Sequence, residues 1–210
     1  MYALTEEFPN QCRRALAIAQ AHPIDLGDFK PSQVVLTGLG GSAAGGDIVR
    51  ALFDALSSTP FSVNRDYTLP GYVGPNTLVI AASYSGMTEE TLAAYADAQS
   101  RGARIIGVTS GGELAQRCEA DGHPCILIPG GQPPRTALGY MMIPALYICE
   151  SLGLLPAQNY ETAFALLDRC AYDWAIEAPL DSNPTKQLAA NLKGKLAVIY
   201  GLGAYQTVAA

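Results

Sequence analysis

Short apolar runs alternate with segments of helical spacing along the first 152 residues of this 210-residue chain. The apolar runs predict strands at residues 33–37, 61–64, 77–82, 103–109 and 125–128. Helical spacing predicts helices at residues 10–21, 42–56, 88–100, 112–120 and 136–152. The main strands are apolar throughout rather than alternating, as expected when helices cover both faces of a sheet. The pattern therefore predicts an α/β fold with a doubly wound parallel sheet.

Residues 153–194 have a different texture, with helical segments around residues 160–176 and 185–193 and a proline-bounded turn between them. They are expected to form a helical connector. One helix face is expected to pack its apolar residues into the core, namely Leu166, Leu167, Cys170, Trp174 and Ile176.

The stretch at residues 195–204 repeats the pattern of residues 34–41, an apolar strand that runs into Gly-Leu-Gly. We therefore expect a first domain with an N-terminal helix over residues 1–152, a connector over 153–194, and the start of a truncated second domain over 195–210. A single strand cannot bury a sheet face by itself. The alternatives are that this strand docks on the first sheet or on a partner chain, or that the repeat is a coincidence.

Composition narrows the class of protein. Hydrophobic residues make up 49% of the chain and charged residues 15%, enough apolar material for a sizeable core. No apolar run is long enough to span a membrane, and the first residues lack a secretory signal, which favours a cytoplasmic protein. A net charge of −6 argues against nucleic-acid binding, but a small anion remains possible. The 5 cysteines contain no C-x-x-C pair, so free thiols are expected rather than a metal site.

Two loops that each follow a predicted strand carry candidate chemistry. Gly38-Leu39-Gly40-Gly41-Ser42-Ala43 opens a helix and fits the dinucleotide pattern G-x-G-x-x-A, with Asp66 placed where a ribose-binding acid could lie. A tight turn explains the same glycines. Ser83-Tyr84-Ser85-Gly86-Met87-Thr88 offers three hydroxyls beside a helix N-terminus, where a phosphate can bind, and its lack of lysine excludes a Walker-A loop. Simple capping of the helix is the alternative for this loop.

Three stretches together resemble sugar isomerase (SIS) domains. They are Gly40-Gly41-Ser42, the stretch from Ser83 to Thr91, and Pro133-Pro134-Arg135-Thr136-Ala137-Leu138-Gly139-Tyr140. The last of these is similar, more narrowly, to the bifunctional phosphoglucose/phosphomannose isomerases. The resemblance implies a flavodoxin-like three-layer α/β/α fold and a homodimer with shared sites. It implies no metal and no nucleotide cofactor.

The resemblance also implies roles for individual residues. Ser83, Ser85 and Thr88 would hold the phosphate of a hexose. Gly41 and Ser42 would contact the sugar, and Arg135 would lie beside its C1 and C2 and stabilise a cis-enediolate. The catalytic base and its helpers would follow Ala210. Glu89 and Glu90 are expected to be first-turn helix charges, and neither His22 nor His123 is expected to be catalytic.

The function expected from this resemblance is the interconversion of fructose 6-phosphate with glucose 6-phosphate and mannose 6-phosphate. Two alternatives stay open. One is a non-catalytic module that binds sugar phosphates, and the other is a Rossmann-type nucleotide-binding protein.

Overall fold

The computed structural model describes residues 2–202, so residues 1 and 203–210 lie outside the account below. Within the described residues, one five-stranded sheet has the order β2-β1-β3-β4-β5. All four neighbouring pairs are parallel. The strands are β1 (Gln33–Thr37), β2 (Phe61–Asn64), β3 (Thr77–Ser83), β4 (Arg104–Thr109) and β5 (Cys125–Leu127). The predicted doubly wound parallel sheet is confirmed.

The strand order separates two of the interpretations. Flavodoxin-like sheets have the order 2-1-3-4-5, whereas dinucleotide-binding Rossmann folds have 3-2-1-4-5-6. The observed order is the first of these. Asp66, the candidate ribose-binding acid, accepts a hydrogen bond through Oδ1 from the backbone N–H of Tyr67 at 2.7 Å. The strand order therefore agrees with the flavodoxin-like expectation and differs from that of the dinucleotide-binding Rossmann fold.

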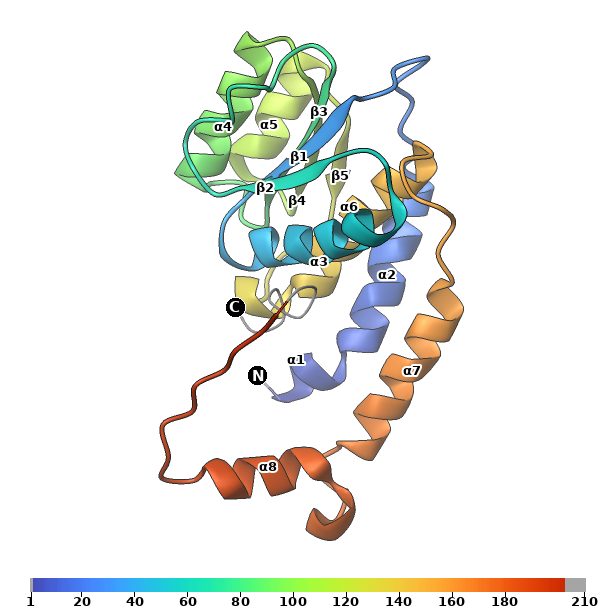
Figure 1. Cartoon of the computed structure of the whole chain (residues 1–210), viewed down its shortest axis with the longest axis vertical. Helices are drawn as coiled ribbons and strands as arrows, with labels where there is room; N and C mark the ends of the chain where they lie inside the picture. Colours follow the sequence, from blue (N-terminus) through green and yellow to red (C-terminus); the bar gives the residue numbers. More distant parts are fainter. Residues whose placement is uncertain (1, 203–210) are drawn as a thin grey trace.

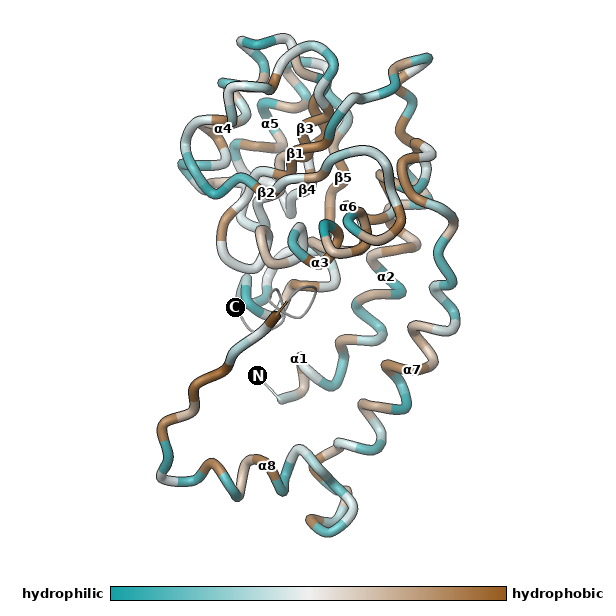
Figure 2. The backbone as a smooth tube through the Cα atoms, in the orientation of Figure 1, coloured by the Kyte–Doolittle hydropathy of each residue, from teal (hydrophilic) through white to brown (hydrophobic). Residues whose placement is uncertain are grey.

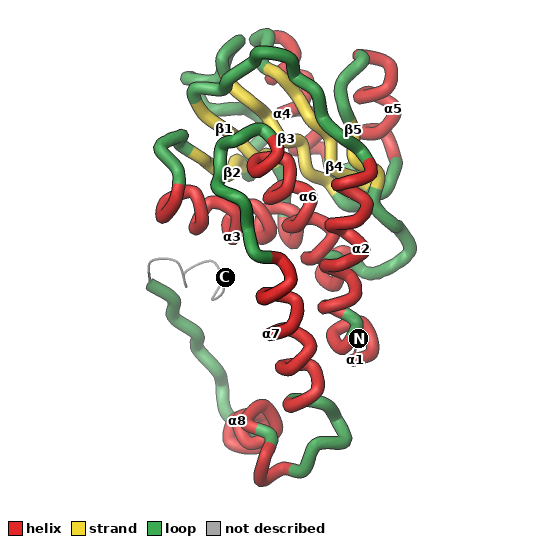
Figure 3. Tube along the Cα trace, turned by 90° about the vertical axis from the view of Figure 1, so that its right-hand side faces the viewer, coloured by secondary structure: helices red, strands yellow, loops and turns green. Residues whose placement is uncertain are grey.

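Helices cover both faces of the sheet, as Figures 1 and 3 show. One face packs against α2 (Phe8–Ala21), α3 (Gly40–Leu56) and α6 (Leu138–Ser151), and the other against α4 (Glu89–Ser100) and α5 (Gly112–Asp121). Successive strand residues point to opposite faces, so Val34 and Leu36 join the first cluster and Val35 the second. All seven residues of β3 are buried. Figure 2 shows the hydrophobic colour concentrated in these strands.

Glycines in α3 let this helix approach its neighbours closely. A Cβ on Gly45 would lie 3.1 Å from the backbone nitrogen of Met142 in α6, and a Cβ on Gly46 would lie 2.7 Å from Cδ2 of Leu36 in β1. A larger side chain at Gly45 would push α3 away from α6, and one at Gly46 would push it away from the sheet. The small residues thus set the position of the α3 N-terminus, which contains most of the first candidate loop, from Gly40 to Ala43.

Most predicted boundaries agree with the structure. The helix expected at residues 136–152 is divided, because a short 3-10 helix, η1 (Pro134–Thr136), precedes α6. A short helix, α1 (Tyr2–Glu6), comes before α2 and was not predicted. The division at residue 137 matters for the candidate site, because it gives Arg135 a turn of its own.

The connector consists of α7 (Tyr160–Asp173), η2 (Leu180–Ser182) and α8 (Pro184–Leu192). Asn159 and Asn183 cap the two α-helices, since each side-chain oxygen accepts from a backbone N–H in the first turn. Arg13 of α2 pairs with Asp168, which holds α7 beside α2. Figure 1 shows α8 standing apart from the sheet.

Two expectations for this region were wrong. Leu166, Trp174 and Ile176 are 61%, 48% and 57% exposed, so the full core stripe does not form. Of its five predicted members, Leu167 and Cys170 are half-buried, and Leu167 packs against the core. Residues 196–202 form no strand, and Leu196 is 93% exposed. An isolated apolar segment has no ladder partner for its backbone groups and so gains nothing from an extended strand. The rest of the Gly-Leu-Gly repeat lies outside the described residues, and the division at residues 152 and 194 stays a prediction.

Asp97 fastens the crossover between β2 and β3 to α4. Its Oδ2 accepts from the backbone N–H of Leu69 at 2.9 Å and from Nη2 of Arg101 at 2.6 Å, while Oδ1 accepts from Nε of Arg101 at 2.7 Å. Burial alone would raise the pKa of Asp97, but the Leu69 N–H and the Arg101 guanidinium outweigh it and lower the pKa below its ordinary value.

We expect Asp97→Asn to lower the free energy of unfolding at pH 7 by about 1–2 kcal/mol, because the amide cannot replace the charge-assisted bonds. A carboxyl whose pKa is depressed in the folded state stabilises above its unfolded pKa and loses that contribution as pH falls through the folded value. The difference between variant and wild type should therefore shrink in urea titrations as the pH falls below the ordinary pKa of an aspartate. Asp54→Asn, at an exposed position of α3, is the control and should change little. A pH-independent loss would contradict the role of charge.

Candidate functional site

Three loops meet at the carboxyl ends of β1 and β3. From β1 the chain passes to β2 on one side and then to β3 on the other, so the strand order reverses between β1 and β3. In open α/β sheets, ligands bind in the crevice that this reversal creates. Two of the predicted loops follow these two strands directly, and the turn that carries Arg135 packs against the first of them.

The second loop gathers its three hydroxyls around one turn. Oγ of Ser83 lies 2.9 Å from Oγ1 of Thr88 and accepts from the backbone N–H of Gly86 at 3.1 Å. Oγ of Ser85 accepts from the backbone N–H of Met87 at 3.2 Å. Ser83 is buried, Thr88 is half-buried and Ser85 is exposed. The structure therefore brings the three predicted residues into a single turn that opens to solvent at Ser85.

The N-terminus of α4 begins immediately after this turn. Thr88 is the N-cap residue, but its hydroxyl makes no capping bond and pairs with Ser83 instead. The first intrahelical bond, from Leu92 N–H to the Thr88 carbonyl, leaves the N–H groups of residues 89–91 without a partner inside the helix. These groups and the helix dipole attract an anion. Because Thr88 does not cap α4 through its side chain, simple capping does not explain the hydroxyls.

Gly86 is the tightest point of the loop. Its φ is +68°, and a Cβ there would lie 1.8 Å from the carbonyl oxygen of Gly111. The backbone N–H of Leu114 donates to the Gly86 carbonyl at 2.9 Å, and both the N–H and Oγ of Ser110 donate to the Tyr84 carbonyl. The turn between β4 and α5 thus supports the loop from behind.

The first loop lies against both of the others. A Cβ on Gly38 would lie 2.7 Å from the carbonyl oxygen of Ala82, at the end of β3. A Cβ on Gly41 would lie 3.2 Å from the carbonyl oxygen of Pro134 and 4.0 Å from Cα of Arg135. Ser42 is buried in the first turn of α3. Gly41 therefore stands beside the turn that carries Arg135, and Ser42 is the next residue of the same helix turn.

Arg135 is exposed, and the described part of the chain gives its guanidinium neither a hydrogen bond nor an ion pair. Its turn is tied to the second loop, because the backbone N–H of Gln132 donates to the hydroxyl of buried Tyr84 at 3.2 Å. The guanidinium is therefore available to an anionic or polar ligand, while its backbone is held in place.

Glu89 and Glu90 occupy the first turn of α4, in agreement with their interpretation as helix-end charges. His22 lies at the end of α2, where Nδ1 is 2.8 Å from the Ile18 carbonyl. His123 stacks edge-on against Tyr95, on the α4–α5 side of the sheet. Among residues 2–202, neither histidine makes a hydrogen bond or ring contact with the three loops, whereas the two glutamates directly follow the hydroxyl turn.

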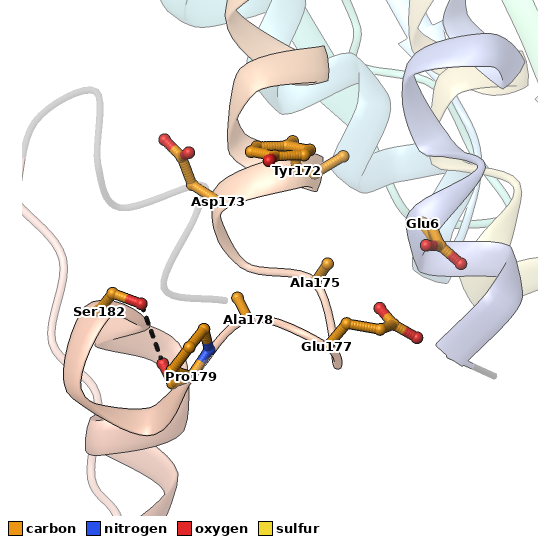
Figure 4. Close-up of a pocket in the computed structure, with 9 residues that line it drawn as sticks. Glu6, Tyr172, Asp173, Ala175, Glu177, Ala178, Pro179 and Ser182 are labelled. Atoms are coloured by element: carbon orange, nitrogen blue, oxygen red, sulfur yellow. Dashed lines mark hydrogen bonds between the residues drawn. The ribbon is translucent and has the colours of Figure 1, made fainter.

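A separate hollow lies at the far end of the connector (Figure 4). It is lined by the carboxyl side chains of Glu6, Asp173 and Glu177, together with Tyr172 and the turn before η2. Within residues 2–202, its lining contains no basic side chain. Like-charge repulsion makes this hollow a poor site for a phosphate, so the strand ends remain the candidate site.

Sequence reasoning missed the residues that hold the loops together, chiefly Gln132 and Gln11. Tyr84 lies inside a motif that drew attention for its hydroxyls, yet its link to Gln132 spans 48 residues. Gln11 contacts the Arg135 turn from 125 residues away. No local pattern predicts such partners.

Known proteins of similar sequence point to the family whose motifs the three loops resemble. Residues 29–131 match the SIS domain family. The chain is 42% identical over 204 residues to a bifunctional phosphoglucose/phosphomannose isomerase of Caldicellulosiruptor bescii, covering 96% of this chain and 60% of that protein. It is 37% identical over 182 residues to the protein of that name in Thermoplasma acidophilum, covering 85% of this chain and 52% of that protein.

Among solved structures, tagatose-6-phosphate ketose/aldose isomerase from Escherichia coli aligns with a TM-score of 0.69 at 21% identity, covering 99% of this chain and 60% of that one. This likeness shows a shared fold. The chain spans roughly half to three fifths of the length of the curated relatives named above.

Proposed function

The chain belongs to the SIS domain family through residues 29–131. From that premise we propose that it provides the substrate-binding domain of an aldose–ketose isomerase. The proposed reaction interconverts fructose 6-phosphate with glucose 6-phosphate and mannose 6-phosphate through a cis-enediolate. The names of the two curated relatives described above support this choice of substrates.

The observation that carries the proposal is the hydroxyl turn of Ser83, Ser85 and Thr88 at the N-terminus of α4. Hydroxyls and unpaired backbone N–H groups bind a phosphate dianion without a lysine. Binding the phosphate there leaves the other end of the sugar to extend toward Gly41, Ser42 and Arg135. We propose that these six residues form the substrate site.

Arg135 supplies the chemistry that this part of the site requires. Removal of the proton from C2 of the aldose places negative charge on the enediolate oxygens. Return of the proton to C1, together with transfer of the hydroxyl proton from O2 to O1, gives the ketose. A guanidinium that has no other partner can donate two hydrogen bonds to those oxygens and stabilise the charge as it develops. C2 is planar in the enediolate, so one intermediate connects both aldose epimers with the ketose.

The reaction also needs a base to move the proton between C1 and C2. Within residues 2–202, the loops that form the site present no carboxylate or imidazole positioned by hydrogen bonds toward Arg135. We propose that the base lies outside these loops, in a region that corresponds to the part of the relatives beyond the alignment with this chain. No metal or nucleotide cofactor enters the proposal.

We also propose a homodimer in the cytoplasm. Exposed apolar side chains on α7 and α8, such as Leu166 and Leu188, supply surface for a dimer interface.

The proposed location in the cytoplasm agrees with the state of the cysteines. All five are free, in keeping with a reducing compartment. None of the helices in the described chain is long and apolar enough to cross a membrane.

A non-catalytic sugar-phosphate-binding module uses the same hydroxyl turn, so ligand binding and turnover have to be measured separately. Thermal unfolding with glucose 6-phosphate, inorganic phosphate, glucose and NAD tests binding. A ligand at about 100 times its Kd stabilises the folded state by about 2.7 kcal/mol. We expect stabilisation by the two phosphates and none by glucose at the same concentration. Stabilisation by NAD alone would overturn the proposal in favour of nucleotide binding.

Turnover is measured as aldose formation from fructose 6-phosphate by the protein that the complete gene encodes. Formation of both epimers supports the isomerase. Binding without any turnover in that protein would reduce the proposal to a sugar-phosphate-binding module.

We expect Ser83→Ala to weaken binding of inorganic phosphate about tenfold, because one hydroxyl is lost and Thr88 and the Gly86 N–H lose their partner. Isothermal titration calorimetry measures the change. Ser100→Ala is a matched control at the other end of α4, where the hydroxyl bonds only to the local Asp97 carbonyl. Equal affinities in wild type and Ser83→Ala would remove Ser83 from the site.

A further inference from the structure

Gln11 is a buried amide that lies behind the Arg135 turn. It belongs to α2, is 2% exposed, and uses both ends of its side chain. Nε2 donates to the carbonyl of Thr136 at 2.8 Å, and Oε1 accepts from the backbone N–H of Gly139 at 2.8 Å. These two backbone groups flank the break between η1 and α6, so Gln11 spans the point where the chain turns after Arg135.

Packing alone does not explain an amide at this position. The neighbouring buried residues of α2 are mostly apolar, among them Cys12, Ala15 and Leu16, and a leucine would bury more apolar surface than the amide. A buried amide destabilises the protein unless its hydrogen bonds are satisfied. Here both are satisfied by backbone groups that the helix break leaves unpaired.

The fit at Gly139 is close. A Cβ there would lie 2.8 Å from Oε1 of Gln11 and 3.0 Å from Sγ of Cys12. The absence of a side chain at Gly139 therefore lets α2 reach the first turn of α6. The glycine and the glutamine form one contact between elements that are far apart in the sequence.

The side-chain amide of Gln132 also donates to the carbonyl of Thr136. Nε2 of Gln132 donates to the Thr136 carbonyl at 2.9 Å, while its backbone N–H donates to the hydroxyl of Tyr84. The Thr136 carbonyl thus receives two amide donors. Through it, the Arg135 turn is joined both to α2 and to the hydroxyl turn that we propose binds phosphate.

We propose that Gln11 is a positioning residue for Arg135, holding its turn so that the guanidinium reaches the carbonyl end of a sugar whose phosphate sits at the hydroxyl turn. The inference rests on the proposed function. Because the guanidinium has no partner of its own in the described chain, the backbone of its turn is the part of Arg135 that the protein holds, and it determines which positions the guanidinium can reach. A misplacement of about 1 Å at a reacting group can reduce a rate about 100-fold.

The test compares two probes on the 210-residue chain. Inorganic phosphate reports the hydroxyl turn alone. Arabinonate 5-phosphate carries a phosphate and, at its other end, a carboxylate that imitates the charge of the enediolate. We expect Gln11→Leu to bind phosphate within about twofold of wild type and arabinonate 5-phosphate about 10-fold to 100-fold more weakly. Gln20→Leu, at an exposed position of the same helix, should bind both like wild type.

The pH dependence of ligand affinity in Gln11→Glu distinguishes a positioning role of Gln11 from a role in stability alone. A protonated carboxyl offers one donor and one acceptor, as the amide does, whereas the ionised form cannot donate to the Thr136 carbonyl. The affinity of this variant for arabinonate 5-phosphate, relative to wild type at the same pH, should recover between pH 8 and pH 5. Gln11→Leu should show no recovery. Burial raises the pKa of the neighbouring Cys12 thiol to about 12, so that group stays neutral throughout.

The outcomes separate the two proposals. If wild type binds neither probe, the proposed function fails and the inference falls with it. If wild type binds both and the Gln11 variants keep the wild-type ratio of the two affinities, only the inference is overturned. An equal loss of both ligands would also overturn it, because Gln11 would then support the fold and not Arg135. If Gln11→Leu does not fold, Gln11→Glu decides by its pH profile.

Discussion

Arg135→Ala should abolish most of the discrimination between arabinonate 5-phosphate and inorganic phosphate. We expect the affinity for arabinonate 5-phosphate to fall about 100-fold or more, because an oxyanion-stabilising donor contributes a factor of about 100 to 1000. The affinity for inorganic phosphate should hardly change, since the hydroxyl turn lies on a different loop. The same substitution in the protein from the complete gene should reduce isomerisation by a comparable factor.

Titration calorimetry with the two probes measures this effect. Arg135→Lys keeps the charge but lacks the planar fork of donors, so it should recover only part of the affinity. Arg169→Ala is a matched control on α7, where, among residues 2–202, the guanidinium pairs only with Asp173 at the surface. A variant that loses both ligands equally would place Arg135 at the phosphate instead of at the enediolate.

Gly86→Ala should disable the hydroxyl turn and destabilise the domain. The positive φ disfavours any side chain, and the new Cβ would meet the carbonyl oxygen of Gly111, so the loop or the turn after β4 has to move. We expect a loss of about 2–4 kcal/mol in the free energy of unfolding. Phosphate should no longer stabilise the variant detectably.

Urea unfolding with and without phosphate measures both consequences. Gly71→Ala is the control, because a Cβ there meets nothing within 4 Å and the backbone is not left-handed. A Gly86→Ala protein with normal stability and normal phosphate binding would show that the loop has another conformation in solution.

Local sequence patterns determined the elements of this protein. The apolar run at residues 33–37 became β1 with unchanged bounds, and so did the run at residues 61–64 as β2. The hydroxyl loop could also be predicted from the sequence. Its hydroxyls lie between a buried strand and a helix start, and residues close together along the chain are enough to identify such an anion-binding turn. The same reasoning failed for residues 196–202, where a strand-like run has no partner strand. Strand pattern is local, but strand pairing is not.

Only the tertiary structure decided how the site is assembled. Gly41 contacts the Arg135 turn, and Tyr84 accepts a hydrogen bond from Gln132. Gln11, near the start of the sequence, accepts a hydrogen bond from Gly139 in the first turn of α6. Each of these contacts joins residues that are far apart in the sequence. Each forms because the strand order and the close approach of α2, α3 and α6 bring those residues together. Periodicity encodes which face of an element is buried, whereas the partner that covers it is chosen by the packing of the whole chain.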